Sequence, residues 1–467
     1  MENDTNERKK WLDIQSEQKK SIQTNHRTDL TSRLKRLDRL KRIVLDHEEE
    51  WFEALKSDLG KPLIETYTSE IGTVLNEIEY LKDNLKDWMT AKKQTSRSLT
   101  GKTEKSLLRQ PHGSVLIISP WNYPLQLTMV PLAGALAAGN RCFIKPSEKS
   151  SAVSHLLNRL ISHYFTPDDV YVVEGEAEVA QRLLEMSWDH IFFTGSSAVG
   201  QKVYEAASKN LTPVTLELGG KNPCIVDETN CTRESVKKII WGKFLNAGQT
   251  CIAPDTVYVH ETVIDRFKSF AVETVHAFYG SDPEKSEAYG RLIDKKQFEH
   301  VTRLLSQGQV VHGGRSDEET LYIEPTLMES IEEGSELASG EVFGPILPIV
   351  PYHSLQLLLN LLQQKSPPLV TYYFTENRDR AAQVQQAVKT GAVMVNQVIL
   401  NSADSEMPFG GVGKSGFGRY HGYSSFKTFT YEKTFYYQTA DYANKLIYPP
   451  YSRRALAALR FIRKRLR

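Results

Sequence analysis

The sequence predicts an α/β fold in which mostly parallel strands alternate with helices that cover both faces of the sheets. From Ser114 onward, short runs of apolar residues alternate with helical patterns, which is typical of βαβ units. The same alternation resumes after Cys251, so two α/β halves are expected. At 467 residues the chain is long enough for about three domains and for a large core that needs no disulfides.

The first 95 residues are expected to be a helical lead. Apolar residues recur at helical spacing among charged ones, namely Leu34, Leu37, Leu40 and Val44. Residues 71–89 show the same pattern. Residues 91–110 are polar and carry little apolar signal, so they are expected to form a connector or an exposed ribbon.

Ten later segments are predicted to be strands, and a helix is expected to begin near Arg378. The ten segments are 114–119, 141–146, 170–175, 190–195, 214–220, 223–227, 256–261, 345–350, 369–374 and 391–397. Each of the first six is followed by a helix or a loop, which predicts parallel pairing with crossover connections.

Residues 110–140 contain no Lys, Arg, Asp or Glu and are long enough to cross a bilayer. Four residues that favour turns or break helices interrupt them: Pro120, Asn122, Pro124 and Pro131. We therefore predict a buried strand, turn and short helix here instead of a membrane span.

The composition is that of an ordinary globular protein, with 40% hydrophobic and 25% charged residues, which excludes global disorder and collagen. The formal net charge of +1 argues against general binding of polyanions such as nucleic acids. Four cysteines are too few for a disulfide scaffold, and the N-terminus lacks the apolar core of a secretory signal. A cytoplasmic location is therefore expected.

The charge is uneven at the C-terminus. The segment 452–467 holds seven basic residues and no acidic ones, so the rest of the chain carries −6. On a helical wheel Leu456, Leu459, Ile462 and Leu466 gather on one side. The basic residues dominate the other side, although Phe461 falls among them. Such a helix is too short and too charged to span a membrane, but it suits an anionic membrane surface. A solvated tail and a helix docked on a partner subunit are the alternatives.

Three glycine clusters are candidates for phosphate loops. In HIFFTGSSAVG a strand is expected to end at Gly195 and a helix to follow, which suits either an anion site or an ordinary turn. The cluster at 409–422 has Gly411, Gly413 and Gly416 at dinucleotide-like spacing, but no strand precedes it, so a structural loop is expected. The third cluster, ELGGKNP, would by itself be an ordinary turn.

The four cysteines lie in different settings. Cys142 and Cys224 fall in strand-like runs and are expected to be small buried hydrophobes. Cys231 precedes a helix without metal-ligand spacing to a partner, and no metal site is expected. Cys251 lies in NAGQTCIAPD, just after a helical segment, where backbone N–H dipoles can lower a thiol pKa. It is either a nucleophile or an inert loop thiol.

Eight motifs occur in the order found in the NAD(P)-dependent aldehyde dehydrogenases: SPWNYP, IKPSE, FTGSSAVG, LELGGKNP, NAGQTCIAPD, EVFGPILP, NQ and MPFGGVGKSGFGRYHG. The chain resembles that superfamily over nearly its whole length, from about Leu30 to Pro450. The short N-terminus, the single cysteine of NAGQTCIAPD and the final YPPY resemble the class 3 branch, which includes fatty and aromatic aldehyde dehydrogenases.

The resemblance implies an aldehyde dehydrogenase-like fold with three parts and a tail. These are a Rossmann-like NAD-binding domain (1–85 and 106–217), an α/β catalytic domain (218–420), a small β oligomerisation arm (86–105 and 421–445) and a basic amphipathic tail (452–467). A homodimer is expected, without nucleic acid.

The resemblance also implies a reaction and the residues that perform it. Cys251 matches the nucleophile, and the Asn122 amide with the Cys251 N–H matches the oxyanion site. Glu217 matches the general base that activates water. The implied reaction oxidises a long-chain aliphatic or aromatic aldehyde to the acid through a thiohemiacetal and a thioester. A coenzyme A-acylating enzyme and a non-catalytic protein of the same fold are the alternatives.

Seven further residues match the cofactor contacts of the superfamily: Lys145, Glu148, Gly195, Ser196, Gly200, Glu341 and Phe343. Lys145 and Glu148 match the adenosine ribose contacts, and the Gly195–Gly200 turn matches the pyrophosphate and adenine region. Glu341 and Phe343 match the groups at the nicotinamide ribose and ring. Glu148 would repel a 2′-phosphate and so favours NAD, although the class 3 branch also includes NADP users.

Overall fold

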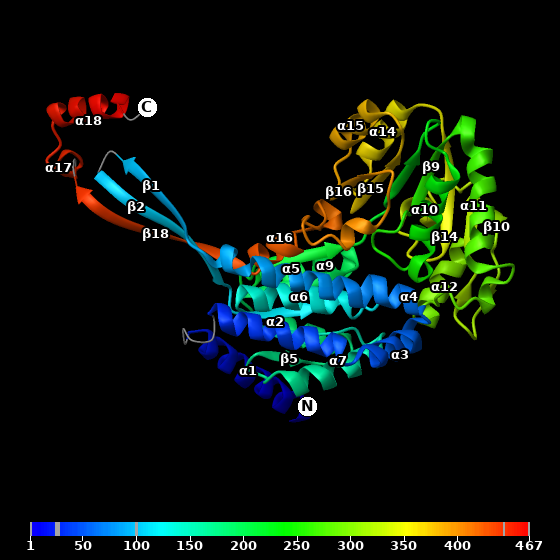
Figure 1. The fold of residues 1–467 in the computed structure, drawn as a ribbon, viewed down its shortest axis with the longest axis horizontal. Coiled ribbons are helices and arrows are strands. Elements are labelled where there is room, and N and C mark those ends of the chain that lie inside the picture. The colour runs from blue at the N-terminus through cyan, green and yellow to red at the C-terminus, as the bar shows by residue number, and fades with distance from the viewer. Residues whose placement is uncertain (1, 24–28, 99–100, 442–443, 466–467) are drawn as a thin grey trace.

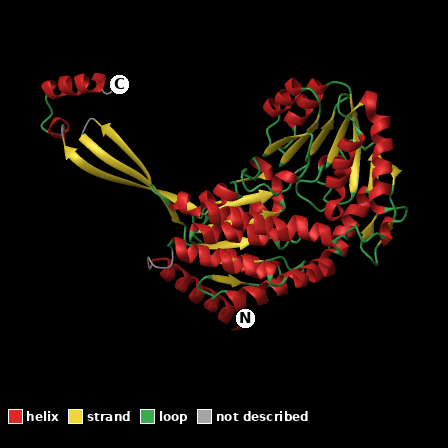
Figure 2. Ribbon diagram, viewed as in Figure 1, coloured by secondary structure: helices red, strands yellow, loops and turns green. Residues whose placement is uncertain are grey.

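The computed structural model describes residues 2–23, 29–98, 101–441 and 444–465. Two α/β bodies pack side by side, and a narrow three-stranded arm projects away from both of them (Figure 1). Helices lie on the outside of both bodies, and strands fill their centres (Figure 2). The α/β fold that the sequence predicts is therefore confirmed.

The first part of the chain is helical, as its apolar periodicity predicts. Its elements are α1 (Glu2–Gln23), α2 (Leu30–Leu45), α3 (Glu48–Leu59), α4 (Leu63–Thr66), the π-helical turn η2 (Tyr67–Ile71) and α5 (Gly72–Met89). Leu37, Leu40 and Val44 on the apolar stripe of α2 are fully buried, so this stripe attaches the helix to the core.

The first body contains a six-stranded sheet of order β17-β7-β6-β3-β4-β5, in which only β17 is antiparallel to its neighbour. Its strands are β3 (Ser114–Ile118), β4 (Arg141–Lys145), β5 (Val170–Val172), β6 (His190–Gly195), β7 (Val214–Leu218) and β17 (Gly416–Phe417). Its connecting helices are α6 (Gln126–Ala138), α7 (Ser151–Tyr164), α8 (Ala177–Leu184) and α9 (Ser197–Ser208).

Both faces of this sheet are covered. Val115 and Ile117 of β3 belong to one buried cluster, whereas Leu116 and Ile118 belong to another. Because successive strand residues point to opposite faces, the apolar run of β3 serves two cores at once.

The second body contains a seven-stranded sheet of order β10-β13-β14-β9-β8-β15-β16, in which only β10 is antiparallel to its neighbour. Its strands are β8 (Pro223–Val226), β9 (Thr256–His260), β10 (Gln309–His312), β13 (Thr326–Glu329), β14 (Ile346–Tyr352), β15 (Val370–Phe374) and β16 (Ala392–Val395). The accompanying helices are α10 (Arg233–Phe244), α11 (Ile264–Tyr279), α12 (Lys295–Leu304), α13 (Glu336–Ser339), α14 (Leu355–Gln364) and α15 (Arg378–Ala387).

Several short strands lie outside the sequence prediction. These are β10, β13, β17 and the two-stranded ribbon of β11 (Ser316–Asp317) and β12 (Tyr322–Ile323). None exceeds four residues, so none carries a periodic apolar signal that could be recognised.

The arm pairs β1 (Lys92–Ser98), β2 (Gly101–Pro111) and β18 (Thr430–Asp441) antiparallel in the order β1-β2-β18. Of the two alternatives for residues 91–110, the exposed ribbon is the one observed. Helix α16 (Gly422–Thr428) precedes β18 and packs on α5 and α6. Helices α17 (Asn444–Ile447) and α18 (Arg453–Arg465) follow at the far end of the arm (Figure 1).

After the end of β2 at Pro111, the uncharged stretch 110–140 forms β3, a turn and α6, as predicted. Every residue of α6 is buried in the protein. Among the described residues, no helix combines the length and the apolar character needed to cross a membrane.

Candidate active site

A cavity of about 610 Å³ lies between the two α/β bodies, and residues from both form its wall. Seven of the ten residues that the sequence predicts for catalysis and cofactor binding line it: Asn122, Gly195, Ser196, Glu217, Cys251, Glu341 and Phe343. The remaining three, Lys145, Glu148 and Gly200, lie outside its wall. The fold thus gathers residues that are spread over more than 200 positions of the sequence.

The edge of the six-stranded sheet supplies one side of the cavity. Asn122 follows β3, Gly195 ends β6 and Glu217 is the next-to-last residue of β7. Because these strands are parallel neighbours, their carboxyl ends meet at one edge, where ligands bind in open α/β sheets.

Cys251 lies in the loop after α10 and the 3-10 turn η3 (Leu245–Gly248). In η3, Asn246 and Ala247 both adopt left-handed backbone conformations, with φ of 52° and 51°. Two non-glycine residues in this region cost conformational energy, and such strain gathers at functional sites. The Asn222 amide donates to the Cys251 carbonyl at 2.7 Å and so anchors the loop from the ELGGKNP turn.

Burial, together with the nearby Glu341 and Glu217, raises the pKa of Cys251 to about 12. The backbone N–H groups of Cys251 and Ile252 act in the opposite direction, as the sequence suggests, but burial outweighs them. The resting thiol is therefore protonated at neutral pH, and it must give up its proton before it can act as a nucleophile.

Glu217 is 3% exposed, and neither of its carboxylate oxygens has a hydrogen-bond partner in the described part of the chain. Burial raises the pKa of Glu217 well above its usual range, while the Arg419 guanidinium lowers it in part. A buried carboxyl without partners is costly to keep, so its presence at a cavity wall indicates a role in proton transfer.

The glycine-rich segment 409–422 is the structural loop that the sequence predicts. Its short strand β17 pairs with β7 and places Gly416 opposite Glu217. Gly416 has a φ of 117°, and a Cβ there would lie 2.0 Å from the Leu216 carbonyl oxygen. Only glycine fits this approach, so Gly416 allows the loop to pack against the strand that carries Glu217.

The Asn122 amide nitrogen donates to the Gln249 carbonyl at 2.9 Å, and the Tyr123 hydroxyl lies 2.6 Å from the Thr250 hydroxyl. Both contacts join the segment after β3 to the two residues that precede Cys251. An amide nitrogen carries two hydrogens, and the bond to Gln249 uses one of those of Asn122.

The turn between β6 and α9 has the geometry of an anion site. Ser196 caps α9 and accepts a hydrogen bond from the Val199 N–H at 3.4 Å, while Gly195, Ser196 and Lys149 line the cavity. Gly200 has a different reason to be glycine. A Cβ at this position would lie 2.6 Å from the Leu218 side chain, so Gly200 allows α9 to pack against β7.

Glu341 and Phe343 lie on the opposite wall. Burial and the neighbouring Asp255 raise the pKa of Glu341 to about 8. A Cβ on Gly219 would lie 2.1 Å from a Glu341 carboxylate oxygen, so the glycine permits this close approach. Phe343 packs edge-on against Trp121, with the ring centroids 5.4 Å apart.

Lys145 and Glu148 contact each other behind the cavity. The Lys145 ammonium lies 3.2 Å from a Glu148 carboxylate oxygen and 2.7 Å from the Pro146 carbonyl. The groups on this side fit a dinucleotide: a helix N-terminus and a lysine can donate to its phosphates, and a carboxylate can accept from its hydroxyls.

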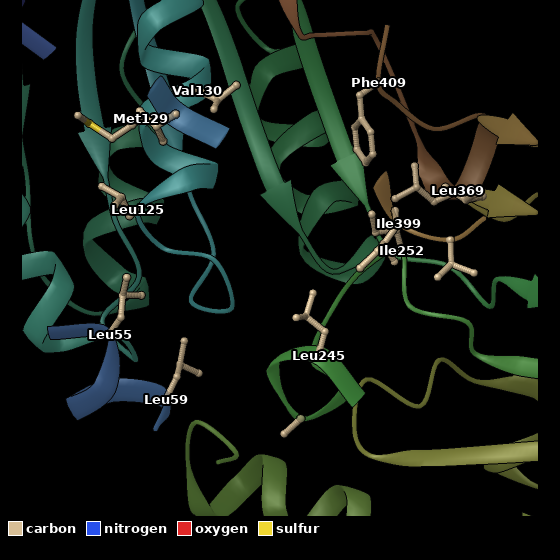
Figure 3. Packing of buried hydrophobic residues seen from close by; sticks show 14 of the residues in the cluster. Leu55, Leu59, Leu125, Met129, Val130, Leu245, Ile252, Leu369, Ile399 and Phe409 are labelled. Carbon is tan, nitrogen blue, oxygen red and sulfur yellow. The ribbon is translucent and has the colours of Figure 1, made fainter. Parts of the chain in front are cut away.

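The rest of the cavity wall is largely apolar. It includes Leu127, Trp241, Leu245, Ile252, Leu369, Ile399 and Phe409. Figure 3 shows Leu245, Ile252, Leu369, Ile399 and Phe409 approaching from the side of the second body. This wall suits an apolar substrate.

Sequence reasoning missed several polar residues that support the site. Glu65 accepts a hydrogen bond from the Asn246 N–H at 2.9 Å, and Lys61 donates to the Asn122 carbonyl at 3.0 Å. Lys61 lies in the turn before α4, and Glu65 lies within α4, which has only four residues. A helix this short shows no apolar periodicity that could mark either residue. Tyr123 lies inside SPWNYP and could have been recognised from its place beside Asn122.

The doubly covered parallel sheet, the helix N-terminus at the cavity and the apolar wall define the class of nucleotide-dependent α/β enzymes. Comparison with known proteins is more specific. The model of the aldehyde dehydrogenase family matches residues 8–435, so the chain belongs to that family and is an NAD(P)-dependent oxidoreductase that acts on an aldehyde.

Its relatives agree with the class 3 resemblance. The chain is 44% identical over 431 residues to 4,4'-diapolycopene-4,4'-dial dehydrogenase of Cytobacillus firmus, covering 90% of this chain and 95% of the relative. It is 41% identical over 426 residues to aldehyde dehydrogenase family 3 member A2 of Pongo abelii, covering 91% of this chain and 88% of the relative. The substrate-bound structure of Staphylococcus aureus AldH superposes with a TM-score of 0.93 at 39% identity, covering 97% of this chain and 99% of that one.

Proposed function

We propose that this enzyme oxidises a long-chain aliphatic or aromatic aldehyde to the carboxylic acid through intermediates bound to Cys251. The observation that carries the proposal is the shared cavity, in which the Cys251 thiol and the unpartnered Glu217 carboxyl face an apolar wall. Names of relatives support the substrate class, since one refers to a carotenoid dialdehyde.

The first step forms a carbon–sulfur bond. The Cys251 thiol releases its proton to solvent water, the sulfur attacks the carbonyl carbon, and the carbonyl π electrons move to oxygen. The Asn122 amide and the Cys251 N–H then donate to this oxygen as its charge develops, which lowers the barrier. Both groups belong to segments tied together by the Asn122–Gln249 hydrogen bond.

NAD(P)⁺, when bound, supplies the acceptor for the hydride that leaves the thiohemiacetal carbon. The residues that would hold it are Lys145 and Glu148, the turn from Gly195 through Ser196 to Gly200, and Glu341 with Phe343. The Glu148 carboxylate would repel a 2′-phosphate, so we propose a preference for NAD.

The last step releases the acid. Glu217 in its ionised form accepts a proton from water, the water oxygen adds to the thioester carbon, and the carbon–sulfur bond breaks to regenerate the thiolate. The raised pKa of Glu217 suits this role because a stronger base removes the proton of water more readily.

A direct assay separates this proposal from its two alternatives. We expect NADH to form with decanal or benzaldehyde in the absence of coenzyme A, with the free acid as the product. An acylating enzyme would require coenzyme A and yield its thioester, and a non-catalytic protein would form no NADH. A series of aldehydes of increasing chain length then identifies the substrate.

We further propose that the chain forms a homodimer through the arm, with the domain limits implied by the resemblance. The arm exposes apolar rings on β18, including Phe435, Tyr436 and Tyr437. Its outer strands β1 and β18 leave edges that a partner can pair with.

The basic tail is proposed to bind an anionic membrane surface from the cytoplasmic side. Helix α18 is exposed, with Leu456 50% and Phe461 58% accessible among its basic residues. Leu466 and Arg467 of the predicted helix lie outside the described residues. A lipid surface would satisfy both the apolar and the basic side chains.

Deleting the residues after Tyr451 is expected to abolish binding to vesicles that contain anionic phospholipid, which sedimentation of protein with vesicles measures. Neutral vesicles are the control, and higher salt should weaken binding of the full chain. Light scattering should give a dimer in both cases, with twice the 53.0 kDa of the full chain before the deletion and twice the mass of the shortened chain after it. Unchanged vesicle binding after the deletion would show that the tail is only solvated or docked on the partner.

A further inference from the structure

A charged pair without a role in the proposed chemistry lies directly behind the oxyanion residue. The Lys61 ammonium lies 2.5 Å from a Glu70 carboxylate oxygen, and both side chains are 0% exposed. Lys61 precedes α4, and Glu70 lies in the π-helical turn η2. π-Helical turns are rare and occur frequently at functional sites.

The pair contacts the segment after β3 at three points. Lys61 donates to the main-chain carbonyl of Asn122 at 3.0 Å, and its ammonium lies 4.1 Å from the centre of the Tyr123 ring. The second oxygen of Glu70 accepts a hydrogen bond from the Gln126 N–H at 2.8 Å, at the start of α6. Each contact holds a main-chain or ring position between residues 122 and 126.

This segment determines where two groups of the site lie. It carries the Asn122 amide, and its Tyr123 hydroxyl contacts Thr250, next to Cys251. The side-chain amide of Asn246, in the loop that leads to Cys251, also donates to the main-chain carbonyl of Asn122, at 2.8 Å. The Asn122 carbonyl is thus held by one donor from each body.

Stability alone does not account for the pair. Removing two charges from water is costly, and apolar residues of similar volume are often equally stable or more stable in such places. What the pair provides instead is directional contact with the main chain, which apolar side chains cannot give.

We propose that Lys61 and Glu70 are positioning residues that hold segment 122–126 so that the Asn122 amide is aimed at the oxygen of the bound aldehyde. The proposal rests on the proposed role of Asn122 in the reaction. Neither residue touches the substrate, and their effect is transmitted through the Asn122 carbonyl and the Tyr123 ring.

The test is the double variant Lys61→Met/Glu70→Gln, which removes both charges together and leaves an oxygen for the Gln126 N–H. We expect kcat for aldehyde oxidation to fall roughly 10- to 100-fold with little change in KM, because a displacement of about 1 Å in an oriented group costs that much. Alkylation of Cys251 by iodoacetamide should keep its rate, since that reaction develops no oxyanion.

Coupling to Asn122 distinguishes positioning from general support of the fold. In an Asn122→Ala background, the double substitution should lower kcat by less than about 3-fold, because the group that it positions is already gone. Equal losses in both backgrounds, or a parallel loss of alkylation, would overturn the proposal. If the double variant does not fold, Lys61→Met alone is measured in the same two backgrounds with the same criterion, because it removes the contacts to the Asn122 main-chain carbonyl and the Tyr123 ring.

The control is Arg36→Met/Asp169→Asn, which removes a largely buried ion pair (2.8 Å) away from the cavity, together with the contacts of Asp169 to Arg141 and Arg39. It should lower the melting temperature but leave kcat unchanged, whereas an equal kcat loss would attribute the effect to stability. A wild-type chain that oxidises no aldehyde would instead reject the proposed function. Failure of the proposed function is thus distinguishable from failure of the positioning role.

Discussion

Replacing Cys251 by alanine is expected to abolish aldehyde oxidation, with kcat/KM reduced by more than roughly 10⁴-fold. The cavity holds this one thiol next to the Asn122 amide and the buried Glu217 carboxyl. Without sulfur no covalent intermediate can form, so the hydride-donating thiohemiacetal is lost together with the thioester. Steady-state NADH formation from a saturating aldehyde measures the effect.

Cys231→Ala is the matched control. Cys231 is also a single unpaired thiol, but it is buried in the loop before α10, where its sulfur contacts the Val263 carbonyl at 3.8 Å, and it does not line the cavity. Its replacement should leave the turnover number unchanged. A Cys251→Ala variant that oxidises aldehyde at the wild-type rate would contradict the covalent mechanism, whatever the control shows.

The elements that could be predicted from the sequence are those with long periodic signals. Strands such as β3 and β6 are continuous apolar runs bounded by turn residues, and α2 repeats its apolar residues at helical spacing. The ribbon of β11 and β12 has two residues per strand and depends on tertiary contacts for its formation. No local pattern can predict strands of that length.

The site likewise combines features that the sequence indicates with features that depend on the fold. Glu217 and Cys251 lie 34 positions apart and meet only because β7 ends where the loop after α10 arrives, so the motif resemblance was needed to pair them. The charge state of Cys251 was harder to foresee. The N–H dipoles that favour a thiolate are visible in the sequence pattern, but the burial that opposes them is a property of the folded protein.

The two glycines of the β6–α9 turn differ in the same respect. The spacing of Gly195 and Gly200 resembles a phosphate turn, and Gly195 indeed lines the cavity. Gly200, however, is required by the approach of the Leu218 side chain, which no sequence pattern reveals. A family motif therefore combines residues that contact ligand with residues that allow elements to pack.

Replacing Glu217 by glutamine is expected to separate the two halves of the reaction. Glutamine keeps the size of the side chain at the end of β7 but cannot accept a proton from water at neutral pH. Thiohemiacetal formation and hydride loss do not need this group in the proposed mechanism. Rapid mixing with aldehyde and NAD should therefore give a burst of about one NADH per site, followed by steady-state turnover lowered roughly 10²- to 10⁴-fold.

The pH dependence checks the same assignment. Because burial raises the pKa of Glu217, the carboxyl is protonated at low pH and becomes an active base only as the pH rises through that value. The kcat of the wild-type enzyme should therefore increase with pH over this range, and the Glu217→Gln variant should lose that increase. Mass spectrometry of the quenched variant should find the acyl group on the peptide that contains Cys251. A variant that turns over steadily without a burst, and with the wild-type pH profile, would assign the base to another residue.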